Sequence, residues 1–152
     1  SYLAWVDGKL TEPFSSHEPI KINNDYSHSK HKVFISKEGK ASHTDFIPLE
    51  YDETLDATLV ACYPHTGRTH QIRVHLAWKH MPILGDRTYG GRIRVPANID
   101  DDLRNLLQKI NRQCLHATRL TITHPHTNAE MSWEVPMPKD MQELVDQLSI
   151  KE

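Results

Sequence analysis

The chain has 152 residues, of which 38% are hydrophobic and 25% are charged, and its formal net charge at pH 7 is −2. This length suits one compact domain with a substantial core, and the composition is that of an ordinary globular protein. The near-neutral charge excludes a globally basic nucleic-acid binder, and no apolar run approaches the roughly 18–20 residues that a membrane-spanning helix needs.

The N-terminal part of the chain predicts short strands between polar loops. Residues 2–6 are an apolar run, and a following Asp-Gly turn signal closes them as a short buried strand. Residues 9–32 are polar and aperiodic, with one short extended piece around residues 20–22, so they are expected to wrap the surface. Residues 33–35 are the next strand candidate.

The middle of the chain predicts a hairpin followed by a helix. Residues 41–50 and 57–63 are extended in character and are joined by a polar connection, so they are expected to pair with each other. The helix is expected to begin near Thr66 or Arg68 and to end near Lys79. Apolar residues spaced four apart mark its buried face, and a proline soon after its end stops it.

The C-terminal part predicts one more helix, two strands and a closing helix. Residues 100–110 begin with three aspartates, which favour a helix N-terminus, and continue with an apolar stripe. Residues 114–123 and 131–135 are expected to be strands, and residues 139–148 the final helix. This order of elements predicts an α+β fold, with a mixed, largely antiparallel sheet and flanking helices.

Charge is unevenly distributed along this near-neutral chain. Between Arg68 and Arg94 there are six basic residues and one aspartate, a balance of +5, whereas residues 128–152 carry a balance of −4. A basic segment can steer a polyanion to one face of a neutral protein. Charge runs are also common on ordinary solvated surfaces, so this pattern alone does not decide the function.

Histidine and cysteine usage predicts neither a metal site nor a disulfide framework. His65, His70, His75 and His80 recur every five residues, but five residues turn a helix by about 500°, so these side chains cannot converge on one ion. No His-Glu-x-x-His, Cys-x-x-Cys or nucleotide-binding glycine motif occurs. A metal-dependent hydrolase is therefore the least favoured alternative. The two cysteines indicate a reducing, cytoplasmic compartment.

Residues 65–76 form the segment with the clearest potential for chemistry. A Thr-Gly-Arg turn enters the expected helix, whose first turns carry Arg68, His70 and Arg73. Free backbone N–H groups and guanidinium groups at a helix start suit a phosphate or a carboxylate. The same pattern also fits a solvated amphipathic helix, so the residue types alone leave both interpretations open.

The sequence resembles the RluA family of RNA pseudouridine synthases in a series of ordered blocks. The family's signature segment is matched by Thr66-Gly67-Arg68-Thr69-His70-Gln71-Ile72-Arg73-Val74-His75. The other matching blocks are residues 82–86 with 89–90, residues 2–4 with Gly8, residues 39–41 with Thr44, residues 114–117 with 124–125, and residues 136–140. The resemblance spans the chain and implies the pseudouridine synthase fold and isomerisation of uridine in RNA, with large-subunit ribosomal RNA as the expected substrate.

One block of the family is not found in this sequence. The family's catalytic aspartate lies in a His-Arg-Leu-Asp motif that precedes the tyrosine block, and this motif does not occur among the 152 residues. Residues 1–152 are therefore expected to form a single partial domain, the C-terminal portion of the catalytic domain, which is inactive without the missing segment. The alternative is a catalytically inactive RNA-binding module of the same fold.

The resemblance also implies roles for individual residues. Arg73 corresponds to the arginine that keeps the catalytic aspartate ionised, Tyr2 to the tyrosine that lies against the target base, and Leu115 to the apolar wall of the uracil pocket. The candidates for contacts with RNA phosphates are Arg68, His70, Arg87, Arg92 and Arg94. Neither a cofactor nor a metal is expected, and the protein is expected to be a monomer with RNA as its partner.

Overall fold

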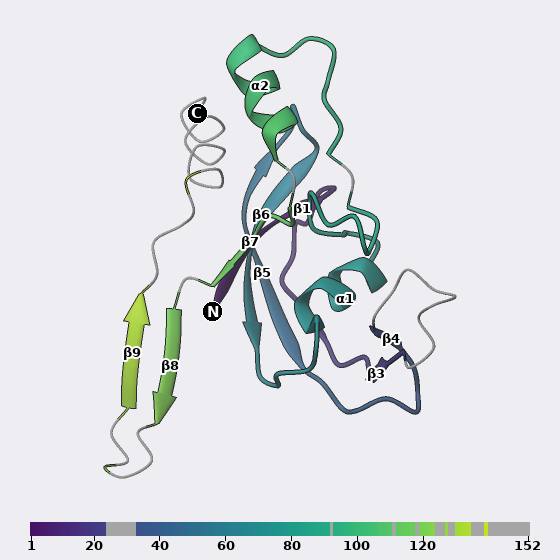
Figure 1. Ribbon diagram of the computed structural model, residues 1–152, viewed down its shortest axis with the longest axis vertical. Coiled ribbons are helices and arrows are strands. Elements are labelled where there is room, and N and C mark those ends of the chain that lie inside the picture. The colour runs from purple at the N-terminus through teal and green to yellow at the C-terminus, as the bar shows by residue number, and fades with distance from the viewer. Residues whose placement is uncertain are drawn as a thin grey trace.

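The computed structural model describes residues 1–23, 33–91, 93–110, 112–117, 119–123 and 130–134, together with Thr127 and Lys139. The strands are β1 (Tyr2–Asp7), β2 (Phe14–Ser16), β3 (Ile20–Ile22), β4 (Val33–Ile35), β5 (Thr44–Asp52), β6 (Ala57–Pro64), β7 (Leu115–Ala117), β8 (Arg119–Thr123) and β9 (Glu130–Glu134). The helices are α1 (Gln71–Trp78) and α2 (Asp101–Lys109). Strands and helices combine into the α+β fold that the sequence predicts (Figure 1). No helix in the described part of the chain is long and apolar enough to cross a membrane.

A five-stranded sheet forms the centre of the fold, in the order β2-β5-β6-β1-β7 (Figure 1). The expected hairpin is confirmed, because β5 and β6 pair from Thr44 opposite Pro64 to Asp52 opposite Ala57. Strand β6 lies between two partners, and its residues 57–62 are all buried, which explains why all of them except Thr58 are apolar. The sequence predicts a mixed, largely antiparallel sheet, and every described pairing is antiparallel.

The edges of the sheet differ most from the sequence prediction. One strand is expected over residues 114–123, but the structure has two, β7 and β8, because β7 ends where Ala117 pairs with Tyr2 at the start of β1. Strand β8 then pairs with β9 in a separate two-stranded sheet. Strand β2 is not expected from its polar sequence. The final helix expected over residues 139–148 lies, apart from Lys139, outside the described residues.

Both helices pack on the main core of the sheet. Ile72 and Leu76 stand four residues apart on α1 and are both buried, as their spacing predicts. Three leucines of α2 join the same core: Leu103, Leu106 and Leu107. Asp100 caps α2, since its side chain accepts a hydrogen bond from the backbone N–H of Leu103 at 2.8 Å. The apolar residues of both helices therefore fix them against the same core.

Candidate active site

The polar motif occupies a turn before α1 rather than the first turns of the helix. The sequence predicts a helix from Thr66 or Arg68, but α1 begins at Gln71. The residue before it, His70, has a φ of 54° and is left-handed, so the backbone cannot be helical there. Arg68 and His70 therefore lie outside α1, and Arg73 is the expected site residue that the helix carries.

A buried glutamine holds this turn against β5. Gln71 is 4% exposed, and its Oε1 accepts hydrogen bonds from the Thr66 hydroxyl at 2.6 Å and from the backbone N–H of Arg68 at 3.1 Å. Its Nε2 donates to the carbonyl oxygen of His43 at 2.9 Å and to the Thr44 hydroxyl at 2.8 Å. The full hydrogen-bonding capacity of the amide is thus used. Nothing in the sequence pattern distinguishes Gln71 from an exposed helix residue, so sequence reasoning missed it.

His75 is a second buried anchor of α1. The side chain is fully buried, and its Nδ1 lies 2.8 Å from the Thr44 hydroxyl. Its Nε2 lies 2.9 Å from both the Ser42 hydroxyl and the carbonyl oxygen of Glu18. Burial lowers the pKa of His75 below its ordinary value of 6.5, so the imidazole is neutral at pH 7. This histidine fixes the helix to the sheet and has no surface for a ligand.

Arg73 forms a bidentate ion pair with Asp86. Its Nε and Nη2 donate to different oxygens of the carboxylate, both at 2.8 Å, and Asp86 is 1% exposed. The guanidinium also lies over the Tyr89 ring, 5.0 Å from its centroid. The hydrogen bonds to Asp86 raise the pKa of Arg73 further above its ordinary value. Because arginine has five N–H donors, this fixed guanidinium can hold a second acceptor besides Asp86.

The loop that carries Asp86 is held against β1. The backbone N–H of Leu84 donates to the carbonyl oxygen of Trp5 at 2.8 Å, so the loop continues the sheet edge beyond β7. The two ends of the loop are also in contact, since the backbone N–H of Gly91 donates to the carbonyl oxygen of Asp86 at 2.8 Å. The approach is so close that a Cβ at Gly91 would lie 1.7 Å from the carbonyl oxygen of Ile83. A residue other than glycine would push these segments apart. The position of Asp86, and through it the orientation of the arginine, is therefore set by the backbone.

Tyr89 links this ion pair to His70. Its hydroxyl lies 2.9 Å from Nδ1 of His70, and the two rings meet edge to face with centroids 5.7 Å apart. Burial raises the pKa of Tyr89, so the phenol is neutral at pH 7. Sequence reasoning assigned no role to Asp86 or Tyr89, although both stand in segments that resemble the family blocks. That resemblance is the signal that could have found them.

Tyr2 and Leu115 lie on neighbouring strands and on the same face of the sheet. In the β1–β7 register Tyr2 is opposite Ala117, and Leu115 is opposite Ala4. Strand residues two apart share a face, so the two side chains are diagonal neighbours, and both pack against the main core. Within the described residues, no hydrogen bond, ion pair or ring contact joins either of them to Arg73.

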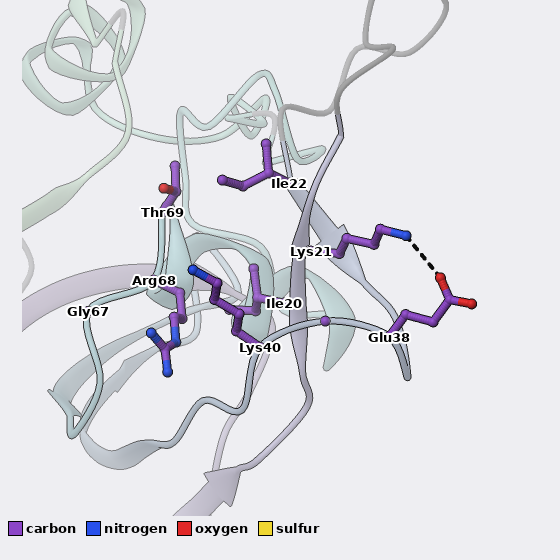
Figure 2. Close-up of a pocket in the computed structure, with 9 residues that line it drawn as sticks. Ile20, Lys21, Ile22, Glu38, Lys40, Gly67, Arg68 and Thr69 are labelled. Carbon is purple, nitrogen blue, oxygen red and sulfur yellow. Dashed lines mark hydrogen bonds and ion pairs between the residues drawn. The ribbon is translucent and has the colours of Figure 1, made fainter.

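Arg68 lines a pocket of about 430 Å³ beside the Thr-Gly-Arg turn (Figure 2). Its Nε donates to the carbonyl oxygen of Ala41 at 2.9 Å, which orients the guanidinium. Lys40 lines the same pocket, whereas the ammonium of Lys21 pairs with Glu38 at 2.9 Å (Figure 2). Two cations with no ion-pair partner among the described residues therefore share this pocket, which suits a phosphate.

The three other arginine candidates for phosphate contacts follow Asp86 in the sequence. Arg87 is exposed and lines a separate pocket of about 510 Å³. Arg94 is 73% exposed and pairs with Asp7 at 2.9 Å. Arg92 lies outside the described residues. The structure therefore distributes the expected contacts over several surface depressions and does not gather them in one patch.

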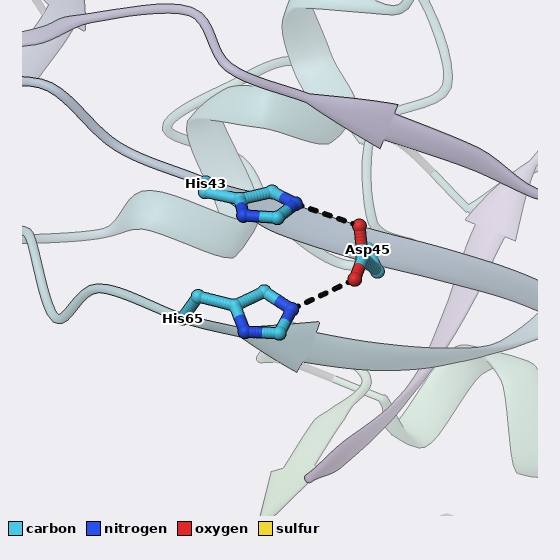
Figure 3. Close-up of side chains that lie close together, drawn as sticks. All are labelled: His43, Asp45 and His65. Carbon is cyan, nitrogen blue, oxygen red and sulfur yellow. Dashed lines mark hydrogen bonds and ion pairs between the residues drawn. The ribbon is translucent and has the colours of Figure 1, made fainter.

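A polar cluster that the sequence does not predict lies at the ends of β5 and β6 (Figure 3). Both oxygens of Asp45 are contacted by imidazoles, by Nε2 of His43 at 2.8 Å and by Nε2 of His65 at 2.7 Å. Hydrogen bonds from Ser15, His65 and His43 hold the pKa of Asp45 well below its usual range. Sequence reasoning considered His65 with the other histidines of its own segment, whereas strand pairing brings it to His43.

Comparison with known protein families gives a match over half of the chain. The family model described as RNA pseudouridylate synthase matches residues 1–78. This range contains β1 to β6 and all of α1. The expected site residues inside it are Tyr2, Arg68, His70 and Arg73.

Individual relatives extend this match to nearly the whole chain. The chain is 36% identical over 141 residues to ribosomal large subunit pseudouridine synthase D of Vibrio vulnificus (strain CMCP6), covering 93% of the chain and 40% of the relative. It is 52% identical over 83 residues to the protein of the same name from Pasteurella multocida (strain Pm70), covering 55% and 26%. It thus spans about two fifths of the length of such relatives, or less. A solved structure, human RNA pseudouridylate synthase domain containing 1, superposes with a TM-score of 0.66 and 26% identity, covering 97% of this chain and 64% of that one.

Proposed function

The chain belongs to the RNA pseudouridylate synthase family, and we propose that it supplies the arginine-bearing part of a site that isomerises uridine to pseudouridine in RNA. In this reaction uracil is detached from the ribose, rotated and rejoined through carbon, with an aspartate as the covalent catalyst. The His-Arg-Leu-Asp motif of that aspartate does not occur among the 152 residues. We therefore propose that the nucleophile is supplied by a further segment, that the full-length protein is the enzyme, and that residues 1–152 alone are inactive.

The observation that carries the proposal is the fixed guanidinium of Arg73. A carboxylate enclosed beside RNA needs a positive partner to stay ionised, since burial alone would raise its pKa. Arg73 meets this need, because Asp86 holds it in one orientation through two hydrogen bonds of 2.8 Å and leaves other donors for the nucleophile. A lysine has no planar fork and could not serve both carboxylates in the same way.

Tyr2 and Leu115 complete the proposed uracil pocket. A base that leaves the RNA stack needs a flat partner, and stacking on an aromatic ring is worth about 1–3 kcal/mol. Tyr2 provides this ring, and Leu115 provides an apolar wall. Their position on one face of two paired strands supports a joint role.

Phosphate contacts are also proposed for five side chains that can donate hydrogen bonds to an anion: Arg68, His70, Arg87, Arg92 and Arg94. The pocket that Arg68 shares with Lys40 gives its assignment the most structural support. The ion pair of Arg94 with Asp7 does not oppose its assignment, because an exposed pair contributes little and an RNA phosphate can replace the carboxylate.

The proposed substrate is large-subunit ribosomal RNA, and the support for it is that the similar bacterial proteins are named ribosomal large subunit pseudouridine synthase D. Modification of ribosomal RNA also fits a cytoplasmic protein. The full-length protein is proposed to act as a monomer and without a cofactor, since aspartate chemistry needs none.

A pseudouridine assay on ribosomal RNA with the full-length protein tests the catalytic proposal. Arg73→Ala should lower the rate by about 10²–10³-fold, because a preorganised charge beside the reacting group is lost. Arg73→Lys should recover little of this loss. Arg104→Ala is the matched control, since the side chain of this α2 arginine donates a hydrogen bond to the carbonyl oxygen of Ala97 and belongs to no proposed contact with the substrate, so its loss should leave the rate unchanged. Full activity in Arg73→Ala would refute the assignment.

RNA binding separates the proposal from its alternative. Arg68→Ala should weaken RNA binding and reduce the dependence of log K on log salt by about 1, because one phosphate contact is lost. Arg104→Ala should change neither quantity. Wild-type protein that binds RNA in this salt-dependent way and forms no pseudouridine would instead be an inactive RNA-binding module.

A further inference from the structure

A cluster of polar side chains, His43, Asp45 and His65, lies at the start of β5 and the end of β6. None of these residues is assigned to the proposed reaction. Asp45 is opposite Tyr63 in the β5–β6 register, and the backbone N–H of His65 donates to the carbonyl oxygen of His43 at 2.8 Å. The two imidazoles therefore stand side by side, with ring centroids 4.2 Å apart. Because residues two apart on a strand share a face, Asp45 projects on the same side as His43.

We propose that His43, Asp45 and His65 bind a divalent transition-metal ion of the zinc type. The ligand atoms of the three side chains all lie within 4.8 Å of one another, and Figure 3 shows both imidazoles directed at the same carboxylate. Two imidazoles and a carboxylate suit Zn²⁺, whose bonds of about 2.0–2.1 Å at tetrahedral angles place ligand atoms about 3.3 Å apart. The Nε2 atoms lie 2.8 and 2.7 Å from the carboxylate oxygens, so small rotations suffice to admit the ion.

Neighbouring side chains hold these ligands in place. The Ser15 hydroxyl donates to Oδ1 of Asp45 at 2.5 Å, and the His17 ring stacks on the His43 ring with centroids 4.1 Å apart. Hydrogen bonds such as that from Ser15 orient ligating carboxylates in known metal sites, and the stacked His17 ring restricts rotation of His43. The side chains of His43, Asp45 and His65 are 34%, 36% and 51% exposed, so an ion can reach them without opening the fold.

The site is separate from the proposed reaction. Thr44 points inward and contacts His75 of α1, so Asp45, the next residue on the strand, lies on the opposite face of β5. A bound ion would cross-link the ends of β5 and β6 directly before the turn of residues 66–68. Because the ion would lie on the face of β5 opposite α1, it would contact neither Arg73 nor the proposed uracil pocket.

Zinc titration of the full-length protein against a chromophoric chelator, with excess Mg²⁺ present, tests this site. We expect one equivalent of Zn²⁺ to bind, and His65→Ala and Asp45→Asn each to weaken that binding about tenfold or more. Magnesium should not compete, since imidazole ligands do not suit it. His80→Asn is the matched control, because it removes an exposed imidazole outside the cluster and asparagine tolerates the left-handed φ of 63° at that position.

Cobalt substitution gives a second readout, because tetrahedral Co²⁺ absorbs visibly and this absorption should disappear in the two cluster variants. Thermal melts of each variant establish that it is folded, and His65→Gln replaces His65→Ala if the latter is not. Absence of stoichiometric binding, unchanged affinity in both cluster variants, or equal weakening by His80→Asn would each overturn the proposal. The test measures metal binding and not pseudouridine formation. Its outcome is therefore independent of whether the proposed function is correct.

Discussion

Replacing Asp86 by asparagine perturbs the ion pair that orients Arg73. Asp86 is 1% exposed and the Arg73 side chain is 13% exposed, so the small values typical of surface pairs do not apply. Removing one partner of a buried pair costs about 3–5 kcal/mol, because the other charge stays buried and uncompensated. Asparagine keeps one acceptor oxygen, so we expect the lower end, about 3 kcal/mol in the free energy of unfolding. For a chain of this size that corresponds to roughly 6–12 °C in Tm.

Urea unfolding followed by circular dichroism measures this loss, and a double-mutant cycle isolates the pair. The cycle combines Asp86→Leu with Arg73→Met, and the coupling energy should exceed about 1.5 kcal/mol. The exposed pair of Arg94 with Asp7 provides the matched control, with an expected coupling below about 1 kcal/mol. If the buried pair couples no more strongly than the exposed pair, Asp86 does not hold the arginine and the reasoning fails.

Two further predictions concern stability. Burial lowers the pKa of His75 below 6.5, so its stabilisation is complete above pH 6.5 and is lost as the pH falls, at up to about 1.4 kcal/mol per pH unit. Urea midpoints measured from pH 7.5 to pH 5 should therefore fall less steeply in His75→Gln than in wild type or in the exposed His80→Asn control, and equal slopes would contradict this. Gly91→Ala should unfold at a clearly lower temperature, because its Cβ would lie 1.7 Å from the Ile83 carbonyl oxygen, whereas Gly67→Ala, whose Cβ meets nothing within 4 Å, should melt as wild type does.

Local signals in the sequence predict much of the fold. The aspartates before α2 predict a helix N-terminus, and Asp100 does cap it. The extended character of residues 41–50 and 57–63, with a polar connection between them, predicts the β5–β6 hairpin. The four-residue spacing on α1 predicts its buried face. The predicted start of α1, at Thr66 or Arg68, is several residues too early. The observed start at Gln71 depends on a left-handed conformation at His70, which residue propensities do not encode.

The site is less accessible from the sequence because its contacts are not local. Arg73 is identified as a charged partner for a carboxylate, but its partner in the structure, Asp86, stands 13 residues away in a loop. That contact depends on how the loop is fixed to β1. The cluster of His43, Asp45 and His65 depends on strand register. The two histidines become neighbours only when β5 and β6 pair in the observed alignment.

The two polar networks meet at the backbone of His43. Its carbonyl oxygen accepts hydrogen bonds from Nε2 of Gln71 at 2.9 Å and from the backbone N–H of His65 at 2.8 Å, and its side chain belongs to the proposed metal site. Gln71 in turn binds the Thr66 hydroxyl, so one residue connects the outer face of the sheet to the turn that precedes α1. An ion at the outer face would therefore stiffen the turn that positions Arg68 without touching RNA. The coupling arises because the backbone of His43 is hydrogen-bonded to Gln71 on one face of the sheet, while its side chain contacts Asp45 on the other.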